Sequence, residues 1–282
     1  MKVLIRTLPR APNALGGEDQ IGFMLQEGFE RLGHSCAVCF DKVRQEADLV
    51  VCMGLGEPAP HRRSMLWCFN ESFDVRQADQ LGYGIVATNS VDPARYGLPY
   101  AHLPLAGHRS MLPVPDAEMA TGGIAYIGNW SNYKQTSIDK YLVPLAKLAG
   151  TELMIFGGSG WTKHPELHGH YRGMLHPHSW PYLRSIAQTW VAFRSEAQGA
   201  MGMMPDRVYN LVAAGVQAVV TDGPVEPELA SMVAVHDDPE QWCSAALSGL
   251  FTGCAQAGPD LVRTTGNYDD RARRILELCA GM

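Results

Sequence analysis

The chain has 282 residues, a length that favours two compact domains over one. Hydrophobic residues make up 46% of it and charged residues 18%, which is typical of globular proteins and argues against a disordered chain. A formal net charge of -6 and a pI near 5.9 argue against a broad basic surface for nucleic acid or anionic membranes, although local basic grooves stay open.

Neither a membrane span nor a signal peptide is recognisable. No run of about 18 apolar residues occurs, and Arg6 interrupts the first apolar stretch too early for a signal sequence. We therefore expect a cytoplasmic protein. The seven cysteines are an odd number, and most lie in apolar segments, as reduced core cysteines do. Cys36 and Cys39 form one CxxC without a second pair, so core packing is favoured over a metal or redox role.

The first part of the chain predicts a parallel sheet with helices on both faces. Residues 2–7 have the composition of a buried strand, and residues 19–32 that of a helix that ends at Gly33. The helix is predicted from apolar residues on one face, namely Ile21, Met24, Leu25, Phe29 and Leu32. Further strands are predicted at 35–40, 47–53, 64–69 and 84–88. Strands alternating with a helix in this way indicate a Rossmann-like domain, which we place at residues 1–108.

A stretch rich in proline, without periodicity, predicts a linker at residues 109–122. Alternation then resumes, which predicts a second Rossmann-like domain at 123–265 and a C-terminal helix within 266–282. Its predicted strands are 123–127, 152–156, 190–193 and 216–221, and its predicted helices are 136–148, 180–188 and 206–214. The expected fold class is therefore α/β, with two Rossmann-like domains and C-terminal helices.

Two predicted strands of the second half end in glycine. Gly128 and Asn129 follow the strand at 123–127, and a run that begins Gly157-Gly158 follows the strand at 152–156. Ligands of parallel sheets bind beyond the carboxyl ends of the strands, where glycine lets a ligand approach the backbone. Each loop by itself is more often an ordinary turn.

The segment 198–210 predicts an anion site. A flexible loop leads directly into a helix, with Pro205 near the first turn and Arg207 inside it. The unpaired N–H groups and positive dipole end of a helix favour a diphosphate, and Arg207 adds a planar cation. The alternative is that Arg207 pairs with a surface carboxylate.

These motifs, taken together and in order, resemble a known family. The stretches YIGNW, MIFGGSGW, YRGML and MMPDRVYNLVAAGVQAVVTD are similar to the donor-binding half of GT-B glycosyltransferases, and most similar to the group related to the spore-maturation protein CgeB. The stretch GGEDQIGFMLQEGFERLGHSCAV resembles the opening of that fold, in which a Gly-Gly loop precedes a helix closed by Gly-His.

The resemblance implies two Rossmann-like domains that face each other across a cleft. A nucleotide-diphosphate sugar would bind the second domain as donor substrate and the acceptor would bind the first, with no other cofactor and usually no catalytic metal. By position, Gly202 and Met203 would present amides to the diphosphate and Arg207 would neutralise it. The other donor-binding residues implied are Asn129 and Lys134 near the phosphates, Tyr171, Arg172 and Gly173 beside the base, and Gly16, Gly17, Gly157, Gly158 and Trp161.

One position departs from the family pattern. Many relatives carry a glutamate that holds the donor ribose, whereas this chain has Asn210, which can hydrogen-bond hydroxyl groups but carries no charge. The identity of the nucleotide therefore stays open.

The catalytic group has three candidates. Sugar transfer needs either a base for the acceptor or stabilisation of the departing diphosphate. Glu18 and Asp19, next to the Gly-Gly loop, and Glu71, after the strand at 64–69, are the candidates. Asp19 is equally suited to capping its helix.

A group of histidines does not indicate a metal site. Their spacing matches no standard zinc pattern, so we expect no metal. The histidines are His164, His168, His170, His176 and His178.

The resulting functional hypothesis is a glycosyltransferase with an unidentified intracellular acceptor. A glycan, a protein, a small molecule or a modified DNA base are all open, and the net charge does not favour DNA except through a local groove. The candidate residues for such a groove are Arg6, Arg10, Arg62 and Arg63. Two alternatives remain: a sugar-nucleotide epimerase or hydrolase on the same fold, or a nucleotide-sugar-binding protein without turnover, which Asn210 suggests.

Overall fold

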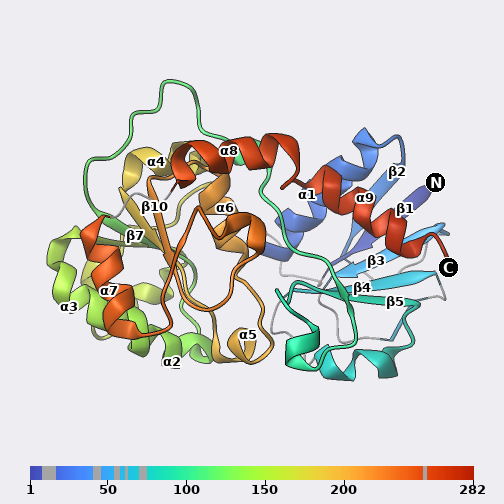
Figure 1. Cartoon of the computed structure of the whole chain (residues 1–282), viewed down its shortest axis with the longest axis horizontal. Helices are drawn as coiled ribbons and strands as arrows, with labels where there is room; N and C mark the ends of the chain where they lie inside the picture. Colours follow the sequence, from blue (N-terminus) through green and yellow to red (C-terminus); the bar gives the residue numbers. More distant parts are fainter. Residues whose placement is uncertain (8–16, 41–45, 54–57, 61–62, 70–74, 250–252) are drawn as a thin grey trace. The chain divides into compact units, whose positions relative to one another are not determined.

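The computed structural model describes residues 1–7, 17–40, 46–53, 58–60, 63–69, 75–249 and 253–282. The chain divides into two compact units, shown in Figure 1. Unit 1 comprises Met1–Leu105, Met201–Met203 and Asn267–Met282, and unit 2 comprises Ala106–Ala200 and Met204–Gly266.

Unit 1 is built on a six-stranded sheet with the order β2-β1-β3-β4-β5-β6. Every pairing in it is parallel. The two middle strands β3 and β4 are buried along their whole length, which explains their uninterrupted apolar sequences. The strands are β1 (Lys2–Arg6), β2 (Ser35–Cys39), β3 (Leu49–Met53), β4 (Ser64–Cys68), β5 (Ile85–Thr88) and β6 (Ala101–His102).

Two helices from opposite ends of the chain pack together in unit 1. Helices α1 (Gly17–Arg31) and α9 (Tyr268–Cys279) lie side by side in Figure 1. At their contact a Cβ on Gly28 would lie 2.5 Å from the carbonyl oxygen of Tyr268, so only glycine permits this approach. Arg31 and Asp269 form an ion pair across the same contact at 2.6 Å. The left-handed Gly33 (φ +82°) ends α1, as its sequence predicts.

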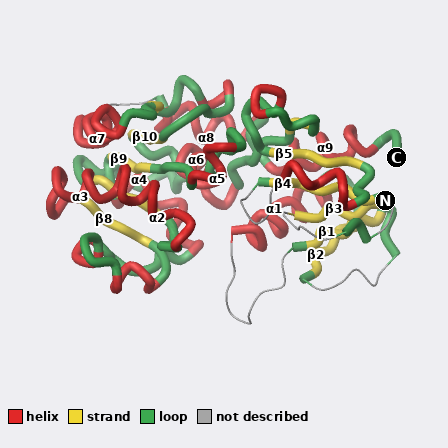
Figure 2. Tube along the Cα trace, turned by 90° about the horizontal axis from the view of Figure 1, so that it is seen from below, coloured by secondary structure: helices red, strands yellow, loops and turns green. Residues whose placement is uncertain are grey.

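Unit 2 is built on a five-stranded parallel sheet with the order β11-β10-β9-β7-β8. Helices and strands are distinguished along the chain in Figure 2. The strands are β7 (Ile124–Ile127), β8 (Leu153–Phe156), β9 (Thr189–Val191), β10 (Ala218–Thr221) and β11 (Ala234–Val235). The helices are α2 (Gln135–Ser137), α3 (Val143–Ala149), α4 (Leu183–Ile186), α5 (Glu196–Ala200), α6 (Asp206–Ala213), α7 (Pro239–Ser248) and α8 (Cys254–Thr264), with a π-helical turn at Ile138–Leu142 between α2 and α3.

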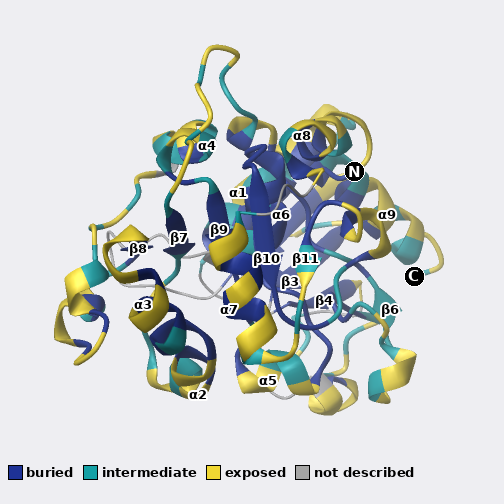
Figure 3. Cartoon of the chain, turned by 60° about the vertical axis from the view of Figure 1, so that its left-hand side comes forward, coloured by how far each residue is buried: buried dark blue, intermediate teal, exposed yellow. Residues whose placement is uncertain are grey.

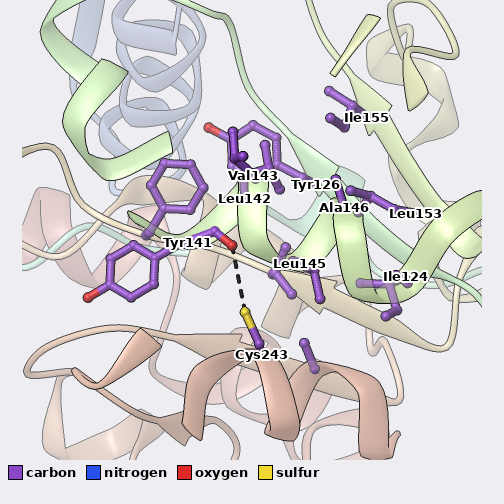
Figure 4. Close-up of a cluster of buried hydrophobic side chains, with 14 of the residues drawn as sticks. Ile124, Tyr126, Tyr141, Leu142, Val143, Leu145, Ala146, Leu153, Ile155 and Cys243 are labelled. Carbon is purple, nitrogen blue, oxygen red and sulfur yellow. Dashed lines mark hydrogen bonds between the residues drawn. The ribbon is translucent and has the colours of Figure 1, made fainter. Parts of the chain in front are cut away.

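The core of unit 2 contains a stack of aromatic rings. Tyr126 on β7 lies parallel to Phe193, with ring centroids 4.9 Å apart, and Phe193 also stacks on Tyr141 at 6.0 Å. Figure 4 shows Tyr126 and Tyr141 in this cluster, with the thiol of Cys243 directed at the backbone oxygen of Tyr141. Figure 3 shows that β9 and β10 are buried and that α7 leaves one face exposed. The strand ends of unit 2 therefore rest on a closely packed core.

Both sheets place their first strand between the second and the third. In unit 2, β7 lies between β8 and β9. The chain therefore runs from β7 to β8 on one side and then crosses back to β9 on the other side. The carboxyl ends of β7 and β9 meet at this reversal, which is the usual ligand-binding position of open parallel sheets. The same order in unit 1 puts its reversal between β1 and β3. The predicted α/β fold class is confirmed by these two sheets.

The unit boundaries differ from the predicted domain limits. The chain passes into unit 2 after Leu105, and the predicted linker 109–122 belongs to unit 2. Arg184 explains this attachment, because its Nε donates to the carbonyl oxygen of Ala117 at 2.8 Å. The C-terminal helix, predicted as a separate segment, belongs to unit 1.

Some elements differ from their sequence signals. The helix predicted at 180–188 is a 3-10 segment Pro177–Tyr182 followed by the short α4, because Pro181 cannot continue an α-helix. The strands β6 and β11 and the helix α5 were not predicted, since two to five residues carry no periodic pattern. Within the described ranges, every helix is too short or too polar to cross a membrane.

Candidate functional site

The loops after β7 and β8 are joined by hydrogen bonds at the carboxyl edge of unit 2. The amide of Gly128 donates to the carbonyl of Phe156 at 2.9 Å. The side-chain oxygen of Asn129 accepts from the amide of Gly158 at 2.8 Å, and the indole of Trp161 donates to the carbonyl of Gly128 at 2.7 Å. The structure thus brings together the two glycine loops that the sequence placed at strand ends.

Gly157 is required by its conformation and by its surroundings. Its φ is +152°, and a Cβ there would lie 2.1 Å from the carbonyl oxygen of Gly128. Its amide donates to the carbonyl of Gly173 at 3.0 Å. The close approach of the two loops therefore depends on this glycine.

The predicted base-side segment Tyr171–Gly173 lies against the same loops. Tyr171 forms an isolated parallel bridge with Ile155 of β8, and its hydroxyl donates to the carbonyl of Gly157 at 3.1 Å. The amide of Arg172 donates to the carbonyl of Ile155 at 2.9 Å. Tyr171, Arg172 and Gly173 therefore extend the edge that Asn129, Gly157, Gly158 and Trp161 form.

Arg207 reaches this edge from α6. Its Nη1 donates to the hydroxyl of Tyr126 at 2.6 Å and to the carbonyl of Ile127 at 3.0 Å. Its Cζ lies 5.1 Å from the centroid of the Tyr126 ring, within cation–π range. A Cβ on Gly128 would lie 2.7 Å from Nη1. The two oxygens and the ring face together orient the guanidinium group.

The start of α6 already satisfies part of its own backbone. Pro205 is the N-cap residue, and the amide of Val208 donates to its carbonyl at 3.2 Å. The carboxylate of Asp206 accepts from the amide of Arg207 at 2.8 Å and adds negative charge to the first turn. The helix end is therefore less favourable for an anion than the sequence suggested, and Arg207 becomes the principal cationic feature there.

Gly202 and Met203 belong to unit 1. Gly202 has a φ of +64°, its carbonyl accepts from the amide of Val91 at 3.0 Å, and a Cβ on it would lie 2.1 Å from the ring of Tyr96. Met203 pairs with Ser90 in an antiparallel bridge and is fully buried in the core of unit 1. Both residues therefore take part in the packing of unit 1.

Lys134 and Asn210 lie in unit 2 on separate elements. Lys134 is in a 3-10 turn before α2, with its ammonium group 5.2 Å from the centroid of the Tyr133 ring. Asn210 is half-buried in α6, and its carbonyl accepts from the amide of Ala214 at 3.0 Å.

Two of the three catalytic candidates lie within the described residues. Glu71 and Gly16 lie outside the described residues, and Gly17 and Glu18 begin α1. Asp19 is 1% exposed and accepts a hydrogen bond from the hydroxyl of Thr7 at 3.0 Å. This contact ties α1 to the end of β1. Such a contact favours a structural role for Asp19 over that of a catalytic base.

A second polar cluster at the sheet edge was missed by the sequence reasoning. The amide of Arg194, after β9, donates to Asp222, after β10, at 2.9 Å, and the Arg194 side chain lies 3.5 Å from both Asp222 and Asp237. A Cβ on Gly223 would lie 1.7 Å from the Arg194 guanidinium carbon. Burial raises the pKa of Asp222, and Arg194 opposes that rise. The strand-end rule that selected the glycine loops would also have selected Arg194 and Asp222.

His164 is a packed core residue. It is 1% exposed, and its Nδ1 accepts from the amides of Glu166 and Leu167, each at 3.3 Å. The rings of Trp130 and Trp161 lie 5.1 and 5.9 Å from its own. Burial lowers the pKa of His164. In the described part of the chain, no group of three or more His, Cys, Asp or Glu residues is arranged to hold a metal.

The cysteines are all free thiols. Burial raises the pKa of Cys36 and of Cys254 to about 12 and that of Cys279 to about 11. A thiol with so high a pKa stays protonated at neutral pH and reacts poorly. Cys36 and Cys39 are three residues apart on β2, so their side chains point to opposite faces of the sheet.

No protein-family model matches the sequence, and a comparison with curated proteins finds no match. Solved structures are similar over nearly the whole chain. The glycosyltransferase AviGT4, involved in avilamycin A biosynthesis, has a TM-score of 0.62 at 15% identity and covers 99% of this chain and 97% of its own. T4 phage BGT in complex with its UDP-glucose substrate has a TM-score of 0.66 at 9% identity, with 99% of each chain covered.

A plant enzyme extends the comparison. The catalytic domain of starch synthase IV from Arabidopsis thaliana, bound to ADP and acarbose, has a TM-score of 0.59 at 10% identity, with 99% of each chain covered. These similarities show that the chain has the fold of the GT-B glycosyltransferases, as the motifs led us to expect.

Proposed function

We propose that the chain is a glycosyltransferase that transfers a sugar from a nucleotide-diphosphate donor to an acceptor. The fold supports this proposal, since the neighbours include T4 phage BGT with its UDP-glucose substrate and a starch synthase bound to ADP. The motif resemblance further supports membership of the CgeB-like group.

The fixed position of Arg207 is the observation that carries the proposal. Its guanidinium is held at the carboxyl end of β7, next to the reversal of the strand order, by the hydroxyl of Tyr126 and the carbonyl of Ile127. A cation held there is suited to the negative charge that develops on a departing diphosphate.

The remaining donor contacts follow from the same edge. Asn129 and the glycine loop 157–158 would lie along the phosphates, Tyr171–Gly173 beside the base, and Asn210 near the ribose. We retain Gly16, Gly17, Lys134, Trp161, Gly202 and Met203 as proposed donor-site residues. For the catalytic base we favour Glu18 or Glu71 over Asp19, because the Asp19 carboxylate is buried and bonded to Thr7.

We propose that transfer needs no bound metal, because Arg207 can supply the positive charge at the diphosphate. One neighbour is T4 phage BGT in complex with UDP and Mn²⁺, so activity should be assayed both with EDTA and with Mn²⁺. We also propose a cytoplasmic location, since seven free cysteines suit a reducing compartment.

The range of proposed acceptors stays wide. One neighbour is a DNA modifying enzyme, a β-glucosyltransferase, which keeps a modified DNA base among the proposed acceptors. The net charge of -6 does not favour DNA without a local basic groove, so glycan, protein and small-molecule acceptors are proposed alongside it.

Replacing Arg207 with alanine tests the proposed site. We expect Arg207→Ala to weaken binding of UDP or ADP about 30-fold, because charge-assisted hydrogen bonds contribute about 2 kcal/mol. Isothermal titration calorimetry measures this. Arg263→Ala, which removes an exposed arginine from α8 of the same unit, is the matched control and should bind like the unaltered chain. Equal affinity of a folded Arg207→Ala variant would contradict the site.

A panel of nucleotide sugars separates the proposed function from its alternatives. Release of nucleotide that depends on an added acceptor supports a transferase. Conversion without an acceptor indicates an epimerase or hydrolase, and binding without turnover indicates a nucleotide-sugar-binding protein. The neutral Asn210 is the feature that favours this last alternative.

A further inference from the structure

We infer that Tyr126 is a positioning residue of the donor site: its hydroxyl and ring set the direction in which Arg207 presents its charge. This inference rests on the proposed function and deepens it, since it names a residue that would act on the diphosphate through Arg207.

The ring of Tyr126 is held in place by close packing. It is fully buried on β7, and its backbone is in register with Ile155 of β8 and Val191 of β9. The ring stacks on Phe193 with an interplanar angle of 9° and meets Trp161 edge-on at 5.9 Å. These ring contacts therefore fix where the hydroxyl lies.

Tyr126 acts on Arg207 in two ways. The hydroxyl accepts from Nη1 at 2.6 Å, and the ring face lies 5.1 Å from Cζ. The carbonyl of Ile127, the next residue of the strand, accepts from the same Nη1 at 3.0 Å. Two acceptors on one nitrogen, both carried by a rigid strand, fix the plane of the guanidinium.

Fixing the guanidinium in advance favours binding. An arginine side chain has large rotamer freedom, and a ligand that must order it loses affinity. A cation already oriented by a buried tyrosine avoids that loss. Removing the hydroxyl would therefore weaken diphosphate binding even though Tyr126 itself is too deeply buried to touch the ligand.

Gly128 completes the arrangement. A Cβ at this position would lie 2.7 Å from both the Arg207 Nη1 and the Tyr126 hydroxyl. Gly128→Ala would therefore disturb the contact between the guanidinium and the hydroxyl, and its Cβ would also lie 3.1 Å from Cζ of the Tyr126 ring. Gly128→Ala thus disturbs the contact of Tyr126 with Arg207 without removing the hydroxyl.

Tyr126→Phe and Tyr141→Phe form a matched pair for the test. Both tyrosines stack on Phe193, and both hydroxyls make a hydrogen bond, that of Tyr141 to the carbonyl of Asp237 at 3.1 Å. The hydroxyl of Tyr126 contacts Arg207, whereas the hydrogen bond of the Tyr141 hydroxyl goes to a backbone carbonyl. Titration of the full chain with UDP and with ADP by calorimetry gives the affinities, and the melting temperature without ligand reports the fold.

We expect Tyr126→Phe to bind the nucleotide diphosphate about tenfold more weakly than the unaltered chain does, because ligand binding must then order the Arg207 side chain. Tyr141→Phe should bind as the unaltered chain does, while both variants lose a similar amount of thermal stability. Gly128→Ala should also weaken binding, which keeps the test decisive if Tyr126→Phe folds poorly.

The outcomes separate this inference from the proposed function. If Arg207→Ala weakens binding and Tyr126→Phe does not, Tyr126 has no positioning role and the donor site stands. If Tyr141→Phe weakens binding as much as Tyr126→Phe, the effect belongs to core packing and the inference is overturned. If Arg207→Ala has no effect, or neither UDP nor ADP binds, the proposed donor site fails and the inference fails with it.

Discussion

At the scale of single residues, burial determines which polar side chains are structural. His164 has its Nδ1 directed at two backbone amides, so the neutral ring accepts what a protonated ring could not. Asp19 similarly uses its buried carboxylate to hold Thr7. Asp19 was a catalytic candidate of the sequence and His164 was not expected to bind a metal, and the structure gives each a packing role.

His164 predicts a stability that falls in mild acid. Burial lowers its pKa below the ordinary value near 6.5, despite opposing effects of Asp139 and Glu166, so the unfolded chain binds the proton more tightly. This stabilisation is complete above pH 7 and is lost as the pH falls through 6.5, by up to about 1.4 kcal/mol per pH unit. Urea unfolding at pH 7.5 and pH 5.5 measures it.

The control for that prediction is His164→Asn. The asparagine oxygen can accept from the same amides but does not titrate. We expect its unfolding free energy to depend less on pH between 7.5 and 5.5 than that of the unaltered chain. Identical slopes would show that other groups produce the acid sensitivity.

At the scale of elements, strand ends of unit 2 are held to one another by side chains and glycines. Arg194 joins the end of β9 to the end of β10 through Asp222, and Trp161 joins its own segment to the end of β7 through Gly128. These links lie at the strand reversal and restrict the geometry of the strand ends there. The candidate site therefore lies on strand ends that are cross-linked by side chains.

Gly223→Ala tests the clamp around Arg194. The added Cβ would overlap the guanidinium carbon at 1.7 Å and would displace it from the buried carboxylate of Asp222. Breaking a buried ion pair in this way is expected to cost about 3 kcal/mol of unfolding free energy. Chemical denaturation measures the loss.

Gly150→Ala is its matched control in the same unit. Gly150 also has a positive φ, +53°, but a Cβ there would meet nothing within 4 Å. It reports backbone strain alone, so the excess loss in Gly223→Ala measures the clamp. Equal losses in the two variants would mean that Arg194 contributes nothing beyond that strain.

At the scale of the whole molecule, the chain alternates between its two units. The segment Met201–Met203 and the segment Asn267–Met282 both belong to unit 1, although the residues around the first and before the second belong to unit 2. Helix α9 accordingly covers α1 with buried Tyr268, Ala272 and Ile275. Each unit is therefore completed by sequence distant from its main part.

Truncation after Gly266 is predicted to destabilise unit 1. Removal of α9 exposes the α1 surface that it covers and breaks the ion pair of Arg31 with Asp269. Hydrogen exchange should show lost protection in β1 and α1 and little change in β7–β10. Truncation after Cys279, which keeps α9 whole, is the control. Unaltered protection of α1 in the longer deletion would contradict a stabilising role for α9.

The sequence by itself determined the elements and the kind of fold. Strand and helix periodicity is local, so alternating segments predict two parallel α/β units, and glycines after β7 and β8 already mark their carboxyl ends. Arg207 was selected for the same reason, because its place at the start of α6 is a local fact.

Only the tertiary structure decided which of these residues meet. Arg207 reaches Tyr126 across 81 positions of sequence, because the strand order brings the end of β7 beside α6. Gly202 and Met203 follow unit 1 since the ring of Tyr96 and the strand-like Ser90 receive them there. Contacts of this kind depend on how distant segments pack, and the periodicity of a single segment does not determine that packing.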